Sequence, residues 1–228
     1  MTKKAVVLNS GGLDSATCLA IATAEGFEIT ALTFDYGQRH NAELKAAQHL
    51  AQHFQVKDHR IVTLPISQWS SSSSLTNVEK VVPRHGEQEG IPTTYVPARN
   101  TIFLSIALSV AESIEAFDIF TGVNAVDYSG YTDCRPEYIH AFQVMANLAT
   151  KTGVEGKSII IRTPLIHWSK SEIIRQGTLL KVPYEKSVSC YQADAQGRAC
   201  GHCDSCAFRK KGFKEAGVTD PTHYRETT

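Results

Sequence analysis

Short apolar runs alternate with longer helical patterns along most of the chain, and this alternation limits the fold more than any other feature of the sequence. The runs Ala5–Leu8, Ile29–Phe34 and Arg60–Leu64 are typical of strands, and Ala and Leu recur at helical spacing between them. Strands that alternate with helices of ten or more residues form a parallel sheet that is covered on both faces. We therefore predict an α/β fold.

The alternation continues to residue 184, where a cysteine-rich tail begins. The predicted elements are helices at Leu13–Ala24, from Asn41, at Arg99–Ile114, at Pro136–Lys151 and from the capping box Ser169-x-x-Glu172, and strands at Ile119–Gly122 and Ser158–Arg162. We predict an α/β domain over residues 1–184 and a separate tail over 185–228. Residues 65–96, which include the serine run Ser70–Ser74, break the pattern. We expect a partly mobile lid over the edge of the active site there, and a solvated insertion is the alternative.

Charge and hydropathy limit the partners of the chain. Lys and Arg total 23 and Asp and Glu total 23, so the net charge is zero. Proteins that bind a nucleic-acid backbone usually carry a basic excess, so we expect a small-molecule substrate and no direct nucleic-acid partner. The longest apolar stretch, Ile102–Ala111, is far shorter than the about 20 residues that span a bilayer. We expect a soluble, cytoplasmic protein with no membrane partner.

A glycine-rich turn, Ser10-Gly11-Gly12-Leu13-Asp14-Ser15, follows the first predicted strand. Two glycines let backbone N–H groups converge, and the positive end of the following helix points the same way, so the turn is a predicted anion site. Its spacing does not fit the dinucleotide fingerprint or the Walker loop.

Four cysteines, Cys190, Cys200, Cys203 and Cys206, cluster in the tail. In a reducing compartment such clusters favour a metal over disulfides. Four thiolates close a tetrahedral zinc shell, so one structural zinc ion per chain is predicted. An iron–sulfur cluster and paired disulfides are the alternatives. Of the two other cysteines, Cys18 is expected to be a buried residue on the packed face of its helix.

The Ser-Gly-Gly-x-Asp-Ser turn resembles the pyrophosphate loop of the N-type ATP pyrophosphatases. With the cysteine tail and segments 34–40 (FDYGQRH), 95–100 (YVPARN) and 122–131 (GVNAVDYSGY), the chain resembles the 7-cyano-7-deazaguanine synthase family almost from end to end. The resemblance implies a Rossmann-like, adenine nucleotide alpha hydrolase-like fold with a C-terminal zinc-binding appendage. It also implies a cytoplasmic homodimer.

The same resemblance implies a ligase of queuosine precursor biosynthesis. Such an enzyme converts 7-carboxy-7-deazaguanine and ammonia to 7-cyano-7-deazaguanine through an adenylated acid and an adenylated amide. ATP, used with Mg²⁺, becomes AMP and diphosphate. The chemistry suits an anion loop, because a carboxylate is a poor electrophile until adenylation makes its oxygen a leaving group.

Site residues follow from the resemblance. The nucleotide-binding residues are Leu8, Asn9, Ser10, Gly11, Gly12, Leu13, Asp14, Ser15, Ala16, Thr17 and Cys18, and the catalytic residues are Asp14, Lys170 and Arg99. The substrate-binding residues are Asn124, Asp127, Tyr128, Tyr131, Asp133 and Arg135. A guanine-like base needs a carboxylate for its N1–H and 2-amino edge, and Arg99 or Arg135 suits the substrate carboxylate. Asp14 as a first-turn acid, Lys170 as a solvated lysine and the loop residues as scaffolding are the alternatives.

Two other functions fit parts of the sequence. A tRNA-thiolating or amidating ATP pyrophosphatase on the same scaffold would need a basic surface and a sulfur-carrying cysteine, for which Cys134 is the candidate. A non-catalytic nucleotide-binding or zinc-ribbon module would bind ATP without releasing diphosphate.

Overall fold

A computed structural model of the chain describes residues 3–126 and 130–226. In these ranges five strands form one parallel sheet: β1 (Lys4–Leu8), β2 (Glu28–Asp35), β3 (Asp58–Thr63), β4 (Asp118–Phe120) and β5 (Ile160–Arg162). Their order is β3-β2-β1-β4-β5, so the direction of winding reverses between β1 and β4. The predicted α/β fold is confirmed.

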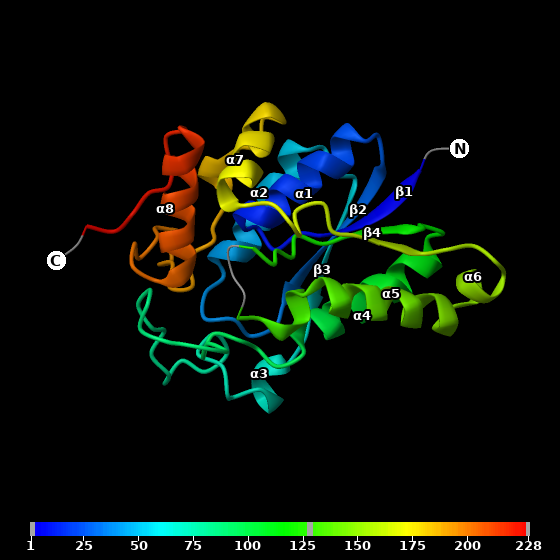
Figure 1. The fold of residues 1–228 in the computed structure, drawn as a ribbon, viewed down its shortest axis with the longest axis horizontal. Helices are drawn as coiled ribbons and strands as arrows, with labels where there is room; N and C mark the ends of the chain where they lie inside the picture. The colour runs from blue at the N-terminus through cyan, green and yellow to red at the C-terminus, as the bar shows by residue number, and fades with distance from the viewer. Residues whose placement is uncertain (1–2, 127–129, 227–228) are drawn as a thin grey trace.

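Helices cover both faces of the sheet (Figure 1). One face carries α1 (Leu13–Ala24), α2 (Ala42–His53) and α7 (Lys170–Leu179), and the other carries α4 (Arg99–Ser113) and α5 (Pro136–Ala149). Successive side chains of β1 point to opposite faces, as the pleat requires. Val6 packs in the core under α4 and α5, and Val7 packs in the core under α1 and α7.

The element boundaries follow local signals. The capping box is present, because Ser169 Oγ accepts from the Glu172 N–H at 3.3 Å and the Glu172 carboxylate accepts from the Ser169 N–H at 2.7 Å. The helix predicted over Pro136–Lys151 ends at Ala149 instead, because the Thr150 hydroxyl caps a new turn, α6 (Lys151–Val154). No helix in the described ranges is both long and apolar enough to cross a membrane.

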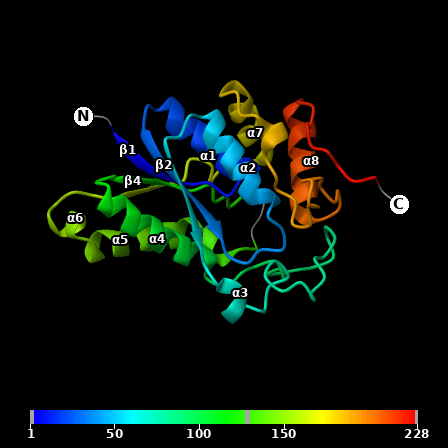
Figure 2. The same ribbon diagram turned by 180° about the vertical axis from the view of Figure 1, so that it is seen from behind.

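The segment between α2 and α4 is irregular apart from β3 and the short helix α3 (Ile66–Trp69). Its serine run is not solvated throughout, since Ser70, Ser73 and Ser74 are at most 5% exposed. The segment reaches the C-terminal helix α8 (Asp204–Ala216), as Figures 1 and 2 both show, and His85 Nδ1 lies 2.7 Å from Asp204 Oδ1. Its mobility stays a prediction.

The tail is folded onto the sheet domain. The described part includes two 3-10 turns, one at Thr132–Cys134 and one at Tyr184–Lys186, and the second leads into the tail. Helix α8 packs against α7. Arg209 of α8 is only 4% exposed, donates to the Tyr184 carbonyl at 2.9 Å and pairs with Asp220 at 3.2 Å. The division into domains at residue 184 stays a prediction.

Candidate active site

A cavity of about 300 Å³ opens at the carboxyl ends of β1 and β4. Leu8 and Asn9 line it from β1 and the loop after it, and Thr121 and Gly122 line it from the loop after β4. The winding of the sheet reverses between these two strands, and α/β sheets bind their ligands at such a point. The topology therefore places the predicted anion loop on the wall of the cavity.

Packing against α2 holds the anion loop in shape. Gly11 has φ +83°, and a side chain there would collide with the Glu43 carbonyl oxygen, so glycine is required on both grounds. Asn9 is 1% exposed, and its Nδ2 donates to the Ala47 carbonyl at 2.9 Å. The Asn9 Oδ1 atom accepts from the Gly11 N–H at 3.3 Å.

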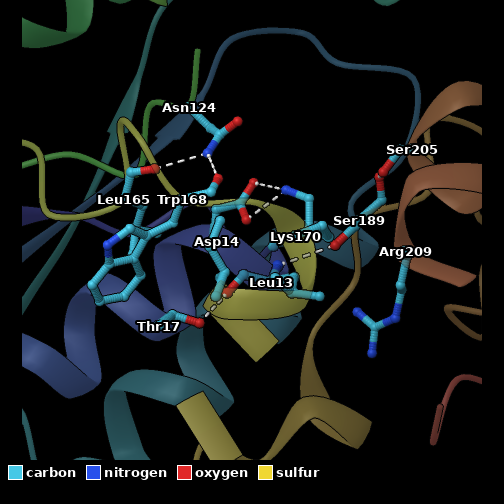
Figure 3. A network of polar contacts seen from close by, with 12 residues as sticks. Leu13, Asp14, Thr17, Asn124, Leu165, Trp168, Lys170, Ser189, Ser205 and Arg209 are labelled. Atoms are coloured by element: carbon cyan, nitrogen blue, oxygen red, sulfur yellow. Dashed lines mark hydrogen bonds and ion pairs between the residues drawn. The ribbon is translucent and has the colours of Figure 1, made fainter. Parts of the chain in front are cut away.

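An ion pair joins the starts of α1 and α7. Lys170 Nζ lies 2.8 Å and 2.9 Å from the two carboxylate oxygens of Asp14, and both side chains line the cavity (Figure 3). Lys170 is 14% exposed, so it is not the solvated lysine of the alternative interpretation. The pair brings a cation to the start of α1, beside the backbone that forms the anion loop.

The tail contacts the loop directly. The Leu13 N–H donates to Ser189 Oγ at 3.0 Å (Figure 3). The Val188 N–H donates to the Gly11 carbonyl at 2.9 Å. The sequence analysis did not single out these tail residues. Their one sequence signal is that Ser189 directly precedes Cys190.

Aromatic side chains surround Arg99 in the part of the cavity that we call the aromatic half. The Arg99 guanidinium lies over the rings of Tyr36, Phe103 and Tyr131, with centroids at 5.7, 5.9 and 6.0 Å. Its Nη1 donates to the Tyr36 hydroxyl at 3.3 Å. Burial raises the pKa of Tyr36 to about 12, so this phenol remains neutral. A cation held among aromatic rings suits a flat, anionic ligand.

Two of the predicted substrate residues line the cavity, Asn124 and Tyr131. Asn124 Nδ2 donates to the Leu165 and Trp168 carbonyls at 2.8 and 2.6 Å, so its amide also shapes the loop before α7 (Figure 3). The Tyr131 hydroxyl donates to Thr94 Oγ1 at 3.0 Å.

The other predicted substrate residues do not line the cavity. Asp133 is buried, and its Oδ2 accepts from the Asn100 N–H at 3.0 Å at the start of α4. Arg135 is exposed, and its Nε donates to the Thr132 carbonyl at 3.1 Å. Asp127 and Tyr128 lie outside the described residues.

The predicted nucleotide segment divides in the same way. Its residues on the cavity wall are Leu8, Asn9, Ser10, Gly12, Leu13, Asp14 and Ser15. Gly11 shapes the turn, and Ala16, Thr17 and Cys18 are fully buried in α1. Burial also raises the pKa of Cys134 to about 12, which disfavours the thiolate that a sulfur carrier needs.

Glu43 is a cavity residue that the sequence analysis missed. It lies in the first turn of α2, and its carboxylate makes no hydrogen bond or ion pair within the described residues. Burial raises its pKa to about 7, against the opposing effect of the Arg99 charge. From sequence it is an ordinary first-turn acid. Its one signal is its place just after the polar loop that follows a predicted strand.

The four tail cysteines come together as predicted. Their sulfur atoms all lie within 4.8 Å of one another, and all four side chains are buried. All six cysteines of the chain are free thiols, so none is paired in a disulfide. Tetrahedral Zn–S bonds of about 2.3 Å place sulfurs about 3.8 Å apart, and Cys200 Sγ lies 3.9 Å from Cys206 Sγ. The Cys200 and Gln192 N–H groups donate to Cys190 Sγ. The cluster is suited to holding a metal ion.

The parallel sheet and its loop after β1 define the fold class, which is adenine nucleotide alpha hydrolase-like, as the resemblance implies. The fold is similar to that of the NMN synthetase of Francisella tularensis, with a TM-score of 0.53 and 16% identity over 96% of this chain and 79% of that one. It is also similar to a 4-thiouridine synthetase solved with RNA and bound ATP, with a TM-score of 0.51 and 18% identity over 97% of this chain and 47% of that one.

Closer sequence relatives narrow this class to one family. The model of the family "Queuosine biosynthesis protein QueC" matches residues 4–217. The 7-cyano-7-deazaguanine synthase of Dechloromonas aromatica (strain RCB) is 61% identical over 99% of this chain and all of its own length. That of Coxiella burnetii (strain RSA 331 / Henzerling II) is 60% identical over 97% of this chain and 98% of its own. The chain belongs to the 7-cyano-7-deazaguanine synthase family, which confirms the resemblance.

Proposed function

We propose that the protein is a 7-cyano-7-deazaguanine synthase, a ligase that uses ATP and ammonia to convert 7-carboxy-7-deazaguanine to the nitrile. The observation that carries the proposal is that one cavity holds both the anion loop with its Asp14–Lys170 pair and the aromatic pocket around Arg99. A nucleotide and a flat acid bound there lie side by side. The tRNA-thiolating alternative is not favoured.

The loop binds the nucleotide phosphates. Its backbone N–H groups and the positive end of α1 attract the triphosphate, and Lys170 is close enough to exchange part of its contact with Asp14 for a phosphate. Mg²⁺ enters with ATP as part of the substrate, and the Asp14 carboxylate is the group suited to hold it. The ion neutralises charge on the phosphates.

The second substrate binds in the aromatic half. Arg99 holds the carboxylate of the acid, and the rings of Tyr36 and Phe103 border its flat bicycle. A carboxylate oxygen attacks the α-phosphorus and diphosphate leaves. Ammonia then displaces AMP to give the amide. A second ATP adenylates the amide oxygen, and loss of AMP leaves the nitrile. The cavity limits water, which would hydrolyse the adenylate.

One zinc ion, held by Cys190, Cys200, Cys203 and Cys206, has a structural role in this proposal. Four thiolates fill its coordination shell, so it has no open position for substrate. Its contribution is to fix the tail, whose Ser189 accepts a hydrogen bond from the Leu13 N–H of the loop.

The test is to incubate the protein with ATP, Mg²⁺, ammonium and the acid and to measure AMP, diphosphate and nitrile. We expect two AMP for each nitrile. Lys170→Met should slow diphosphate release about 100-fold, because a fixed cation then no longer faces the phosphates. The matched control is Lys211→Met, on an exposed side chain of α8.

Two outcomes of this assay would count against the proposal. ADP and phosphate as products would contradict the adenylation chemistry. ATP binding without any diphosphate release would favour a non-catalytic binding module.

A further inference from the structure

Nitrile synthesis imposes a proton balance that the residues assigned so far do not meet. If the proposed function holds, ammonia loses one proton when it becomes the amide nitrogen. The amide nitrogen loses a second proton when its oxygen is adenylated, and the imidate nitrogen loses a third as AMP leaves. All three protons leave the same nitrogen atom. A site that limits water therefore needs a base beside that atom.

Two carboxylates line the cavity within the described part of the chain, Asp14 and Glu43. Asp14 is occupied, because Lys170 Nζ lies within 2.9 Å of both of its oxygens. Glu43 faces the same cavity without a hydrogen bond or ion pair to any described residue. Of the two, Glu43 is therefore the carboxylate that can accept a proton without first breaking an ion pair.

The backbone holds Glu43 in register with the anion loop. The Glu43 carbonyl is packed so closely on Gly11 that a side chain at position 11 would collide with it. Arg99, which faces the substrate carboxylate in the proposed function, lines the same cavity, and its charge acts on the Glu43 carboxylate. The side chain of Glu43 is thus placed near the junction of the two substrates, where the nitrogen bonds to carbon.

We propose that Glu43 is the general base that takes the protons from the reacting nitrogen. In each step the N–H bond breaks, its electron pair stays on nitrogen, and the proton passes to a Glu43 carboxylate oxygen and then to solvent through the cavity mouth. AMP leaves with the electron pair of the C–O bond, so the step needs no oxidant or reductant.

The electrostatic surroundings agree with this role. With a pKa of about 7, Glu43 is a stronger base than an ordinary carboxylate and is still ionised in part at neutral pH. Arg99 and Tyr36 are electrostatically coupled to Glu43. The other charged and titratable groups that line the cavity are Asp14, Arg39, His40, Tyr131, Cys134, Lys170, Tyr191 and Arg209. Arg39 donates to backbone carbonyls, and burial lowers the pKa of His40.

The test compares Glu43→Gln with Glu137→Gln, which changes an exposed first-turn glutamate on α5. The first assay is ATP–diphosphate exchange with the acid and no ammonia, which removes no proton from nitrogen. The second is nitrile formation from the chemically prepared amide and ATP. We expect Glu43→Gln to keep exchange within about threefold and to lose about 100-fold or more in nitrile formation. Glu137→Gln should change neither rate.

The pH profile gives an independent readout. A base must be deprotonated to act, so the wild-type rate from the amide should rise as the pH increases through about 7 and then level off. Glu43→Gln should lack this rise, and Glu43→Asp should keep part of it.

Each contrary outcome is informative. Unchanged nitrile formation in Glu43→Gln would overturn the proposal. A loss of exchange together with a raised KM for the acid would also overturn it, since Glu43 would then bind the acid. If the wild-type protein itself shows no exchange, the proposed function fails, and this proposal fails with it.

Discussion

At Gly11 two independent constraints act on a single residue. The backbone has φ +83°, which side chains rarely adopt, and the Cβ position is blocked by the backbone of α2. The first constraint is common to many turns. The second exists because the loop and α2 pack together, and it ties the shape of the anion site to the position of a neighbouring helix.

We expect Gly11→Ala to weaken ATP binding at least tenfold, because removing the clash must move the loop away from α2. Calorimetric titration with a non-hydrolysable ATP analogue measures the effect. The control is Gly26→Ala, where φ is +77° but nothing lies within 4 Å of the added carbon. Equal ATP affinity in the two variants would show that the close approach to α2 is unimportant.

At the scale of elements, the irregular segment after α3 depends on one side chain of the loop before α2. Arg39 donates to the carbonyls of Ser74 and Lys80 at 2.9 and 2.6 Å, and it also contacts those of Asn77 and Val78. A segment with little regular structure satisfies its carbonyl groups in this way. The loop after β2 therefore positions the covering segment as well as the cavity wall.

We expect Arg39→Ala to increase amide hydrogen exchange across residues 73–81 by about 30-fold, because about 2 kcal/mol of hydrogen bonding to that segment is lost. Exchange in the strands should not change. Arg60→Ala is the control, since its guanidinium pairs with the exposed Asp58. If the segment exchanges at the wild-type rate in Arg39→Ala, other contacts hold it in place.

At the scale of the whole molecule, the cysteine cluster and the anion loop are one structural unit. No cysteine of the cluster lines the described cavity, yet neighbouring residues of the tail bond to both Leu13 and Gly11. The segment next to the cysteine cluster therefore contacts the anion loop through residues 188 and 189. The predicted homodimer does not enter this argument and stays a prediction.

Metal removal tests that coupling. A zinc chelator should lower the melting temperature by about 10 °C and weaken ATP binding, because the tail loses the anchor that holds Ser189 on the loop. Mass spectrometry of the native protein should give one zinc ion per chain. Lys211→Met is the control and should keep both the metal and the affinity, since this side chain is exposed on α8 and lies outside the cluster. Unchanged ATP affinity after complete metal loss would contradict the coupling.

Part of the fold and of the candidate site could be predicted from residues that are close together in the sequence. The Ala, Leu and Ile residues at helical spacing, followed by Gly26, placed α1 at Leu13–Ala24, as observed, because helix-forming residues and the glycine that ends the helix are encoded in adjacent turns. The Ser169 capping box and the cysteine cluster were also evident, since the box spans only residues 169–172 and the cysteine spacing fits a closed metal shell.

Contacts between distant parts of the chain decided where other predicted residues lie. Asp133 was predicted to read the substrate, yet its carboxylate accepts from the Asn100 N–H at the start of α4. A solvated insertion was the alternative interpretation of residues 65–96, yet Ser73 and Ser74 in that segment are fully buried. The position of Asp133 and the burial of the serines both depend on contacts between residues far apart in the chain. Periodicity in the sequence does not predict such contacts.

The sequence by itself determined the strands of the sheet, most of the helices, the glycine-rich turn and the cysteine cluster, because each of these is encoded by neighbouring residues. The order of the strands was decided only by the tertiary structure. Placing β1 beside β4 brings Asp14, Glu43 and Arg99 to one cavity from three different helices. Which side chains meet there follows from how the sheet is wound, and that is a property of the whole fold.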